Sequence, residues 1–183
     1  HHIISSEPLQ KGGRTDDFFF LESDGDAARK LVCDLVTTRL PRSYGFDPIR
    51  DIQVLCPTKL GPTGTQALNV ELQNLLNPEQ KGKPQLQSAS RVFRVGDKVM
   101  QVRNNYEIVW NRIGGEQGVG AYNGDIGIVE SINPRDRSMV VRMDDRRLIY
   151  PAENLGELEI AYAITVHKSQ GSEFPAVILP VAQ

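Results

Sequence analysis

Apolar and polar residues follow two different periods along this chain. From Ala27 to Leu40, apolar residues recur at the three- and four-residue spacing of an amphipathic helix, and Pro41 ends the pattern. Short apolar runs at 17–21 and 52–56 lack that spacing and are typical of buried strands. A second helical pattern, made of leucines, runs from Leu68 to Leu76. The order strand, helix, strand, helix predicts an α/β fold with a parallel sheet.

The pattern changes after the polar stretch 81–84. Short β-rich runs separated by turn residues replace the helices and predict a small all-β barrel; these runs are 97–102, 126–132, 138–143 and 146–150. Segment 111–120 has four glycines and no hydrophobic period, and we expect a mobile loop there. The α/β pattern resumes at Leu158, so the barrel is expected as an insertion. The predicted domain ranges are 1–88 and 156–183 for the α/β part and 89–155 for the barrel.

Most of the polar chemistry near the end of this sequence lies in one segment between two apolar runs. The runs 160–164 and 176–181 are predicted to be buried strands. Segment 165–173 between them carries hydroxyl, imidazole, ammonium, carboxamide and carboxylate groups. At the edge of a sheet, such groups and nearby backbone amides can converge on a phosphate or a nucleotide. The segment therefore predicts a ligand site rather than part of a core.

Composition narrows the choice of partners. The chain is 39% hydrophobic and 24% charged, with a net charge of −2 and a pI near 6.0, so it has no overall basic field. Residues 91–150 hold ten basic and eight acidic side chains, a net charge of +2 against −4 for the rest. Any contact with nucleic acid must therefore be local.

Cysteine, histidine and hydropathy patterns set further expectations. Cys33 and Cys56 lack CxxC spacing, and the three histidines form no paired ligand pattern, so we expect no structural metal and a reducing cytoplasm. No apolar run approaches the roughly 20 residues that span a bilayer. The first residues do not have the pattern of a signal peptide. We therefore expect no membrane partner.

Three separated segments carry a family resemblance. Residues 161–174 (AYAITVHKSQGSEF) resemble motif V of superfamily 1 DNA helicases, in the branch of RecD and TraA. Residues 54–65 (VLCPTKLGPTGT) are similar to the motif IV region of that branch, and 96–101 (GDKVMQ) with 122–127 (YNGDIG) are similar to its SH3-like insertion. The resemblance implies the second RecA-like, P-loop NTPase-like motor domain of a recombination or repair helicase, interrupted by an SH3-like β-barrel. Such helicases move 5′ to 3′ on single-stranded DNA.

The same resemblance implies roles for particular residues. Gln170, Gly171 and Glu173 match positions that face ATP and its magnesium ion, with Gln170 in a catalytic role. Thr165 and His167 match positions that contact the backbone of single-stranded DNA. Further candidate contacts with single-stranded DNA are Lys168 beside them, Thr58 and Lys59 in the loop after a predicted strand, and Asn104 and Asn105, whose side chains can hydrogen-bond bases. The implied partners are single-stranded DNA, the remainder of the helicase chain and other recombination or repair subunits.

Each assignment has a simpler alternative. His167 and Lys168 are also consistent with surface residues, Thr165 with a helix cap, and Glu173 with an ion-pair partner. The segment that holds Thr58 and Lys59 is also consistent with a plain strand-to-helix loop, and the segment with Asn104 and Asn105 with a turn. Lys59 departs from the family pattern, because the family has a basic residue immediately before the glycine that matches Gly61, where this chain has Leu60.

No Gly-x-x-x-x-Gly-Lys-Ser/Thr sequence occurs in the chain. The resemblance therefore implies a fragment that cannot hydrolyse ATP alone and whose nucleotide site is completed by a missing first motor domain. A competing hypothesis is a non-catalytic module that binds nucleic acid or another protein through the β-barrel. A third is a conjugative relaxase of the TraA type, which requires a nicking domain that is absent from this sequence.

Overall fold

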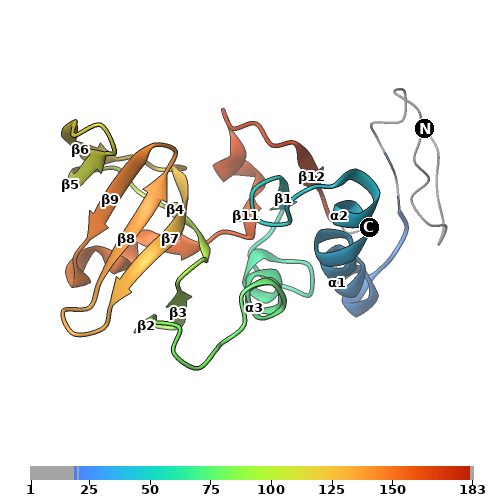
Figure 1. Ribbon diagram of the computed structural model, residues 1–183. Coiled ribbons are helices and arrows are strands. Elements are labelled where there is room, and N and C mark those ends of the chain that lie inside the picture. Colours follow the sequence, from blue (N-terminus) through green and yellow to red (C-terminus); the bar gives the residue numbers. More distant parts are fainter. Residues whose placement is uncertain (1–18, 20, 182–183) are drawn as a thin grey trace. The chain divides into compact units, whose positions relative to one another are not determined.

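The computed structural model describes residue 19 and residues 21–181, and the chain divides into two compact units (Figure 1). The first unit comprises 1–76 and 163–183, and the second comprises 77–162. The second unit therefore begins before, and ends after, the range 89–155 expected from the sequence. The apolar run at 17–21 falls largely outside the described residues.

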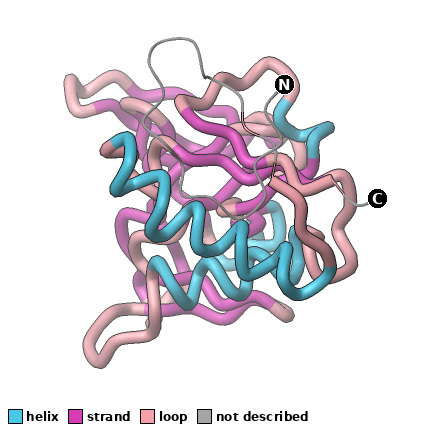
Figure 2. Tube along the Cα trace, turned by 90° about the vertical axis from the view of Figure 1, so that its right-hand side faces the viewer, coloured by secondary structure: helices cyan, strands magenta, loops and turns pink. Residues whose placement is uncertain are grey.

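One helical segment opens the described part of the first unit. It consists of α1 (Gly25–Asp34), the π-helical turn η1 (Leu35–Arg39) and α2 (Leu40–Tyr44), which follow one another without a break (Figure 2). The prediction that Pro41 ends the helix was wrong. Pro41 is the second residue of α2, which follows directly after the π-helical turn η1, and the helix continues through it to Tyr44 before Gly45, whose φ is 71°, ends it.

A parallel sheet forms the other part of the first unit. Its strands are β1 (Ile52–Cys56), β11 (Ala163–Thr165) and β12 (Ala176–Ile178), in the order β11-β1-β12. Helix α3 (Thr65–Leu76) follows β1 and also contacts α1 and β11. The predicted parallel sheet, β1 and α3 are confirmed.

The apolar run 176–181 was predicted to be buried, and that prediction was wrong. Only its first three residues form β12, which pairs with a single neighbour in the described part of the chain. Val177 and Leu179 are 48% and 52% exposed. The run marks a strand correctly, but an edge strand leaves much of its surface uncovered.

The second unit is an antiparallel β structure. A hairpin of β2 (Gln85–Ser88) and β3 (Arg91–Arg94) forms a two-stranded sheet. A seven-stranded sheet has the order β10 (Leu158–Ile160), β4 (Lys98–Gln101), β7 (Ile126–Asn133), β8 (Ser138–Met143), β9 (Arg146–Tyr150), β5 (Asn105–Arg112) and β6 (Gln117–Ala121). The short helix η2 (Ala152–Glu157) precedes β10. The four predicted strands are confirmed, whereas the paired strands form a sheet and do not by themselves demonstrate closure into a barrel.

Two details of the second unit differ from the prediction. Strand β10 pairs with β4, so the parallel sheet resumes at Ala163 and not at Leu158. Segment 111–120 is not one loop but holds the end of β5, a short turn at 113–116 and most of β6. Gly118 is needed in β6 because an aromatic ring lies on the backbone: a Cβ there would stand 2.3 Å from the ring of Trp110.

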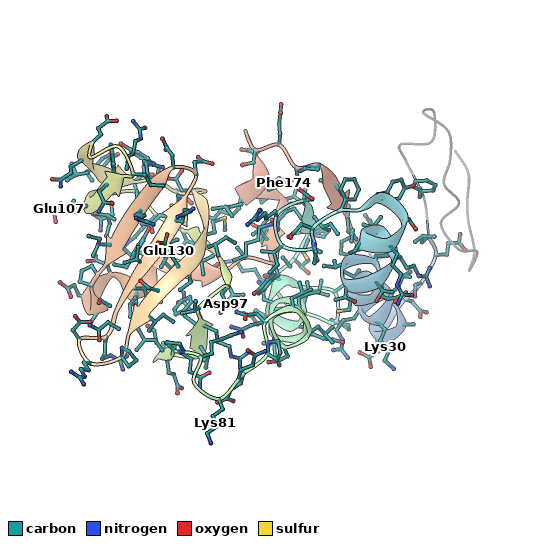
Figure 3. The ribbon with its side chains drawn as sticks, in the orientation of Figure 1. Lys30, Lys81, Asp97, Glu107, Glu130 and Phe174 are labelled. Atoms are coloured by element: carbon teal, nitrogen blue, oxygen red, sulfur yellow. The ribbon has the colours of Figure 1, made fainter. Side chains whose placement is uncertain are left out.

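A buried carboxylate joins the two ends of the second unit. Asp97 is fully buried, and its Oδ1 accepts hydrogen bonds from Asn77 Nδ2 at 2.7 Å and Tyr162 OH at 2.8 Å. Its Oδ2 accepts a hydrogen bond from the backbone N–H of Arg94 at 2.7 Å. Asn77 and Tyr162 are the first and last residues of this unit, so one side chain fixes the points where the chain enters and leaves it. Figure 3 labels Asp97.

Candidate functional site

The two segments of the first unit that carry predicted site residues lie at the same edge of the parallel sheet. Strands β1 and β11 are parallel neighbours, and their last residues, Cys56 and Thr165, are partners in the register. The β1–α3 loop, with Thr58 and Lys59, therefore leaves the sheet beside the 3₁₀ turn η3 (Val166–Ser169). The carboxyl ends of parallel strands are where α/β folds bind ligands, so this edge is the candidate site.

Backbone bonds give the β1–α3 loop a fixed shape. The N–H groups of Thr65 and Gln66 donate to the carbonyls of Thr58 and Lys59, at 3.2 and 3.1 Å. Gly64 is required at the turn, because a Cβ there would lie 2.4–2.6 Å from backbone atoms of the preceding loop residues. The Thr58 hydroxyl donates to the Leu60 carbonyl at 2.9 Å and so serves the loop itself. The Lys59 side chain is exposed.

The η3 turn presents polar groups to solvent. Thr165 is half-buried at its start, and His167 is exposed, with no hydrogen bond or ion pair to any other described residue. Ser169 Oγ donates to the Val166 carbonyl at 2.6 Å, which closes the turn. Lys168 is half-buried. Thr165, His167 and Lys168 therefore come from one short segment at the end of β11.

The residues predicted to face a nucleotide follow directly. Gln170, Gly171 and Glu173 are exposed, and the side chains of Gln170 and Glu173 make no hydrogen bond or ion pair with other described residues. Gly171 has a φ of 79°, and a Cβ there would meet no atom within 4 Å. A glycine is therefore favoured at this position because of the backbone conformation, and the space beside its Cα is open. A free carboxamide, a free carboxylate and open backbone are groups that fit the polar edge of a nucleotide.

Asn69, which sequence reasoning missed, holds this segment in place. Its Nδ2 donates to the carbonyl of Ala163 at 2.8 Å, and its Oδ1 accepts from the N–H of the same residue at 2.8 Å. The carboxamide of α3 thus caps the start of β11 as another strand would. A polar residue next to Leu68 in an apolar helix pattern was the only sequence signal.

The two asparagines predicted to contact DNA lie in the second unit and are engaged within it. Asn104 Oδ1 accepts from the N–H of Asn123 at 2.9 Å, and Asn105 Nδ2 donates to both carboxylate oxygens of Glu157 at 3.0 Å. Asn105 Oδ1 accepts from the N–H of Glu107 at 2.9 Å. The polar atoms of Asn105 are therefore used inside the fold, while Asn104 remains exposed.

Glu157 is the centre of a buried polar network. Its side chain is 2% exposed and also accepts hydrogen bonds from Arg103 at 2.8 Å, Asn154 at 2.9 Å and Gln101 at 2.9 Å. Burial alone would raise the pKa of this carboxyl, but the hydrogen bonds from Arg103, Asn154, Asn105 and Gln101 outweigh burial and lower the pKa to about 2. The network ties η2 to the β4–β5 connection.

Among the described residues there is neither a metal-ligand cluster nor a membrane-spanning helix. No group of three or more His, Cys, Asp and Glu side chains among them is arranged to hold a metal ion. No helix in the same part of the chain has the length and apolar character needed to cross a membrane.

Two helicase family models match the chain in separate segments. Residues 68–143 match the model described as the SH3 domain of ATP-dependent RecD-like DNA helicases, and residues 160–183 match the C-terminal domain of UvrD-like helicases. Among solved structures, a Pif1 helicase from Bacteroides in complex with ADP-AlF3 and single-stranded DNA aligns with 21% identity over 84% of this chain and 39% of that chain. The TM-score of this alignment is 0.46.

Curated relatives cover most of the chain. The ATP-dependent RecD2 DNA helicase of Deinococcus radiodurans is 34% identical over 97% of this chain and 21% of its own length. The RecBCD enzyme subunit RecD of Mycobacterium tuberculosis is 29% identical over 72% of this chain and 20% of its own length. The chain thus spans about a fifth of the length of these relatives. Two matching models in the expected order, together with relatives aligned along most of the sequence, establish that the chain belongs to the RecD-like DNA helicases of superfamily 1.

Proposed function

We propose that this chain is part of an ATP-dependent DNA helicase that moves 5′ to 3′ on single-stranded DNA. In this proposal the first unit is a portion of a RecA-like motor domain, and the second unit is an SH3-like barrel inserted into it. Support comes from the family membership and from the parallel sheet of the first unit. The parent polypeptide would supply the other motor domain, which completes the nucleotide site.

The observation that carries the proposal is the register of β1 and β11. Because Cys56 and Thr165 are partners, two loops with exposed polar groups leave the same edge of the sheet. Lys59, His167 and Lys168 would contact phosphates of the DNA strand, since ammonium and imidazole groups donate to phosphate oxygens. Thr165 would add a hydroxyl donor, while Thr58 already donates within its loop.

ATP and magnesium would bind beside the next few residues. Gln170 would donate to a phosphate or orient the attacking water, Gly171 would let the nucleotide approach the backbone, and Glu173 would accept from the ribose hydroxyls. Bound magnesium would neutralise phosphate charge. The DNA-facing and ATP-facing residues lie on one short segment, so a shift of this segment on nucleotide binding would move the DNA contacts directly.

ATP hydrolysis by the parent polypeptide tests this proposal. Single-stranded DNA should stimulate hydrolysis in the wild type, and Gln170→Ala should abolish the stimulated turnover while the affinity for single-stranded DNA stays near normal. Gln80→Ala, at an exposed glutamine of the second unit, is the matched control and should behave as wild type. DNA binding without stimulated turnover in the wild type would refute the helicase proposal and favour a non-catalytic binding module.

A further inference from the structure

Two exposed tyrosines form an aromatic surface on the second unit. Tyr106 is 66% exposed and Tyr122 is 46% exposed, although large aromatic side chains are usually covered in a fold of this size. Their rings meet edge to face, with centroids 6.1 Å apart. They come from the start of β5 and the end of β6, and Figure 3 marks this part of the molecule through Glu107, which follows Tyr106 in sequence.

Hydrogen bonds hold both connections that carry the rings. The N–H of Asn123 donates to Asn104 Oδ1 at 2.9 Å and so joins the two connections to each other. The N–H of Tyr122 donates to Asp125 Oδ2 at 3.0 Å, and the N–H of Gly124 donates to the carbonyl of Gln101 at 2.8 Å. The backbone that carries the rings is therefore held in place before any ligand arrives, which lowers the entropy lost on binding.

A glycine gives Tyr122 its position. Gly120 has a φ of 118°, and a Cβ there would stand 2.9 Å from the Tyr122 hydroxyl oxygen. The phenol ring thus lies over the β6 backbone at a residue without a side chain. In the same way, the ring of Trp110 lies over Gly118, so an aromatic ring covers the backbone at each glycine of β6.

Polar side chains in the segment that leads to Tyr106 suit nucleotides. The Arg103 side chain is 67% exposed, although one of its nitrogens is fixed by the buried Glu157 carboxylate. Asn104, the next residue, is also exposed. A planar guanidinium and a carboxamide can contact the edges and phosphates of nucleotides, whose bases stack on aromatic rings.

We propose that Tyr106 and Tyr122 form a stacking platform for bases of single-stranded DNA, with Arg103, three residues before Tyr106, as a further contact. The platform rests on the proposed function for the identity of its ligand, but it lies in a different unit from the residues proposed to face phosphate and nucleotide. The sequence suggested Asn105 as a base contact, but the polar atoms of Asn105 are used within the fold. The platform assigns the base contact to the neighbouring aromatic rings instead.

Stacking and phosphate contacts respond differently to salt. A lost phosphate contact lowers the slope of log affinity against log salt concentration, because fewer counterions are released on binding. A lost stacking contact lowers the affinity at every salt concentration and leaves that slope unchanged. The slope therefore separates a role of the tyrosines from a role of Lys59 or Lys168.

Fluorescence anisotropy with a labelled oligothymidylate tests the platform in this chain over a range of salt. Tyr106→Leu and Tyr122→Leu should each weaken binding roughly fivefold or more without changing the salt slope. Restoring a ring, as in Tyr106→Phe, should restore most of the affinity. Tyr44→Leu, at a partly exposed tyrosine of the first unit, is the control and should leave binding unchanged.

Four outcomes decide the matter. Affinities of both leucine variants within twofold of wild type overturn the platform, as does a failure of the wild-type chain to bind oligothymidylate at low salt. Weakening by Lys59→Ala without weakening by the tyrosine variants overturns the platform but supports the proposed DNA contact at the sheet edge. Weakening by the tyrosine variants alone supports the platform and contradicts that contact. Circular dichroism verifies folding, and the highly exposed Tyr106 tests the idea if Tyr122→Leu does not fold.

Discussion

Replacing Asn69 by alanine removes both hydrogen bonds that hold the start of β11 to α3. The N–H and the carbonyl of Ala163 each lose a partner at 2.8 Å, and Ala163 is only 1% exposed, so water cannot replace those partners without opening the fold. A neutral hydrogen bond contributes about 0.5–1.5 kcal/mol, and an unsatisfied buried group costs about 1–3 kcal/mol. We expect Asn69→Ala to lower the free energy of unfolding by roughly 2–4 kcal/mol.

Urea unfolding of the chain, followed by far-ultraviolet circular dichroism, measures this effect. Gln66→Ala, at an exposed position of the same helix, is the control and should stay within about 0.5 kcal/mol of wild type. Asn69→Asp keeps the shape of the side chain but sets a carboxylate oxygen against the Ala163 carbonyl, so it should also destabilise. If Asn69→Ala unfolds at the same urea concentration as the control, the carboxamide does not hold β11 and the reasoning is wrong.

Three further predictions concern the second unit. Asp97→Ala leaves buried donors without an acceptor and should lower the free energy of unfolding by roughly 2–6 kcal/mol, against about 1 kcal/mol for Tyr162→Phe; equal small effects in urea unfolding would contradict this. Gly118→Ala should displace the ring of Trp110, the one tryptophan of the chain, and shift its fluorescence to longer wavelength; an unchanged spectrum would contradict the contact. Because the folded pKa of Glu157 is lowered from 4.5 to about 2, its contribution of roughly 3 kcal/mol is complete above pH 4.5 and is lost as the pH falls toward 2; Glu157→Gln should flatten this part of the stability profile.

The sequence predicted the helices and strands whose burial imposes a regular spacing of apolar residues. The apolar period of α3 and the short runs of β1 and β8 are visible in the sequence because burial on one face or two imposes a spacing. Segment 111–120 was misjudged because its four glycines suggested a single loop. Gly118 and Gly120 lie instead in β6, where the rings of Trp110 and Tyr122 cover the backbone, and no apolar period in the sequence records that packing.

The candidate site was predictable only in part, for a similar reason. The polar run 165–173 between apolar runs marked the site without any structure, and its family resemblance assigned the roles. The pairing of Cys56 with Thr165, which sets the two loops at one edge, joins residues more than a hundred positions apart. Asn69 and Asp97 act through hydrogen bonds to residues distant in the sequence. Nothing in the local sequence therefore distinguishes either of them from other polar residues.

In the proposed function, one short segment at the end of β11 serves both ATP and single-stranded DNA. The most direct test is the affinity of the parent polypeptide for single-stranded DNA, measured with and without a non-hydrolysable ATP analogue, in wild type and in Gln170→Ala. The account predicts that the analogue changes the affinity of the wild type and that Gln170→Ala removes this change while the affinity without nucleotide stays the same. A nucleotide effect that persists in Gln170→Ala, or that is absent from the wild type, would contradict the account.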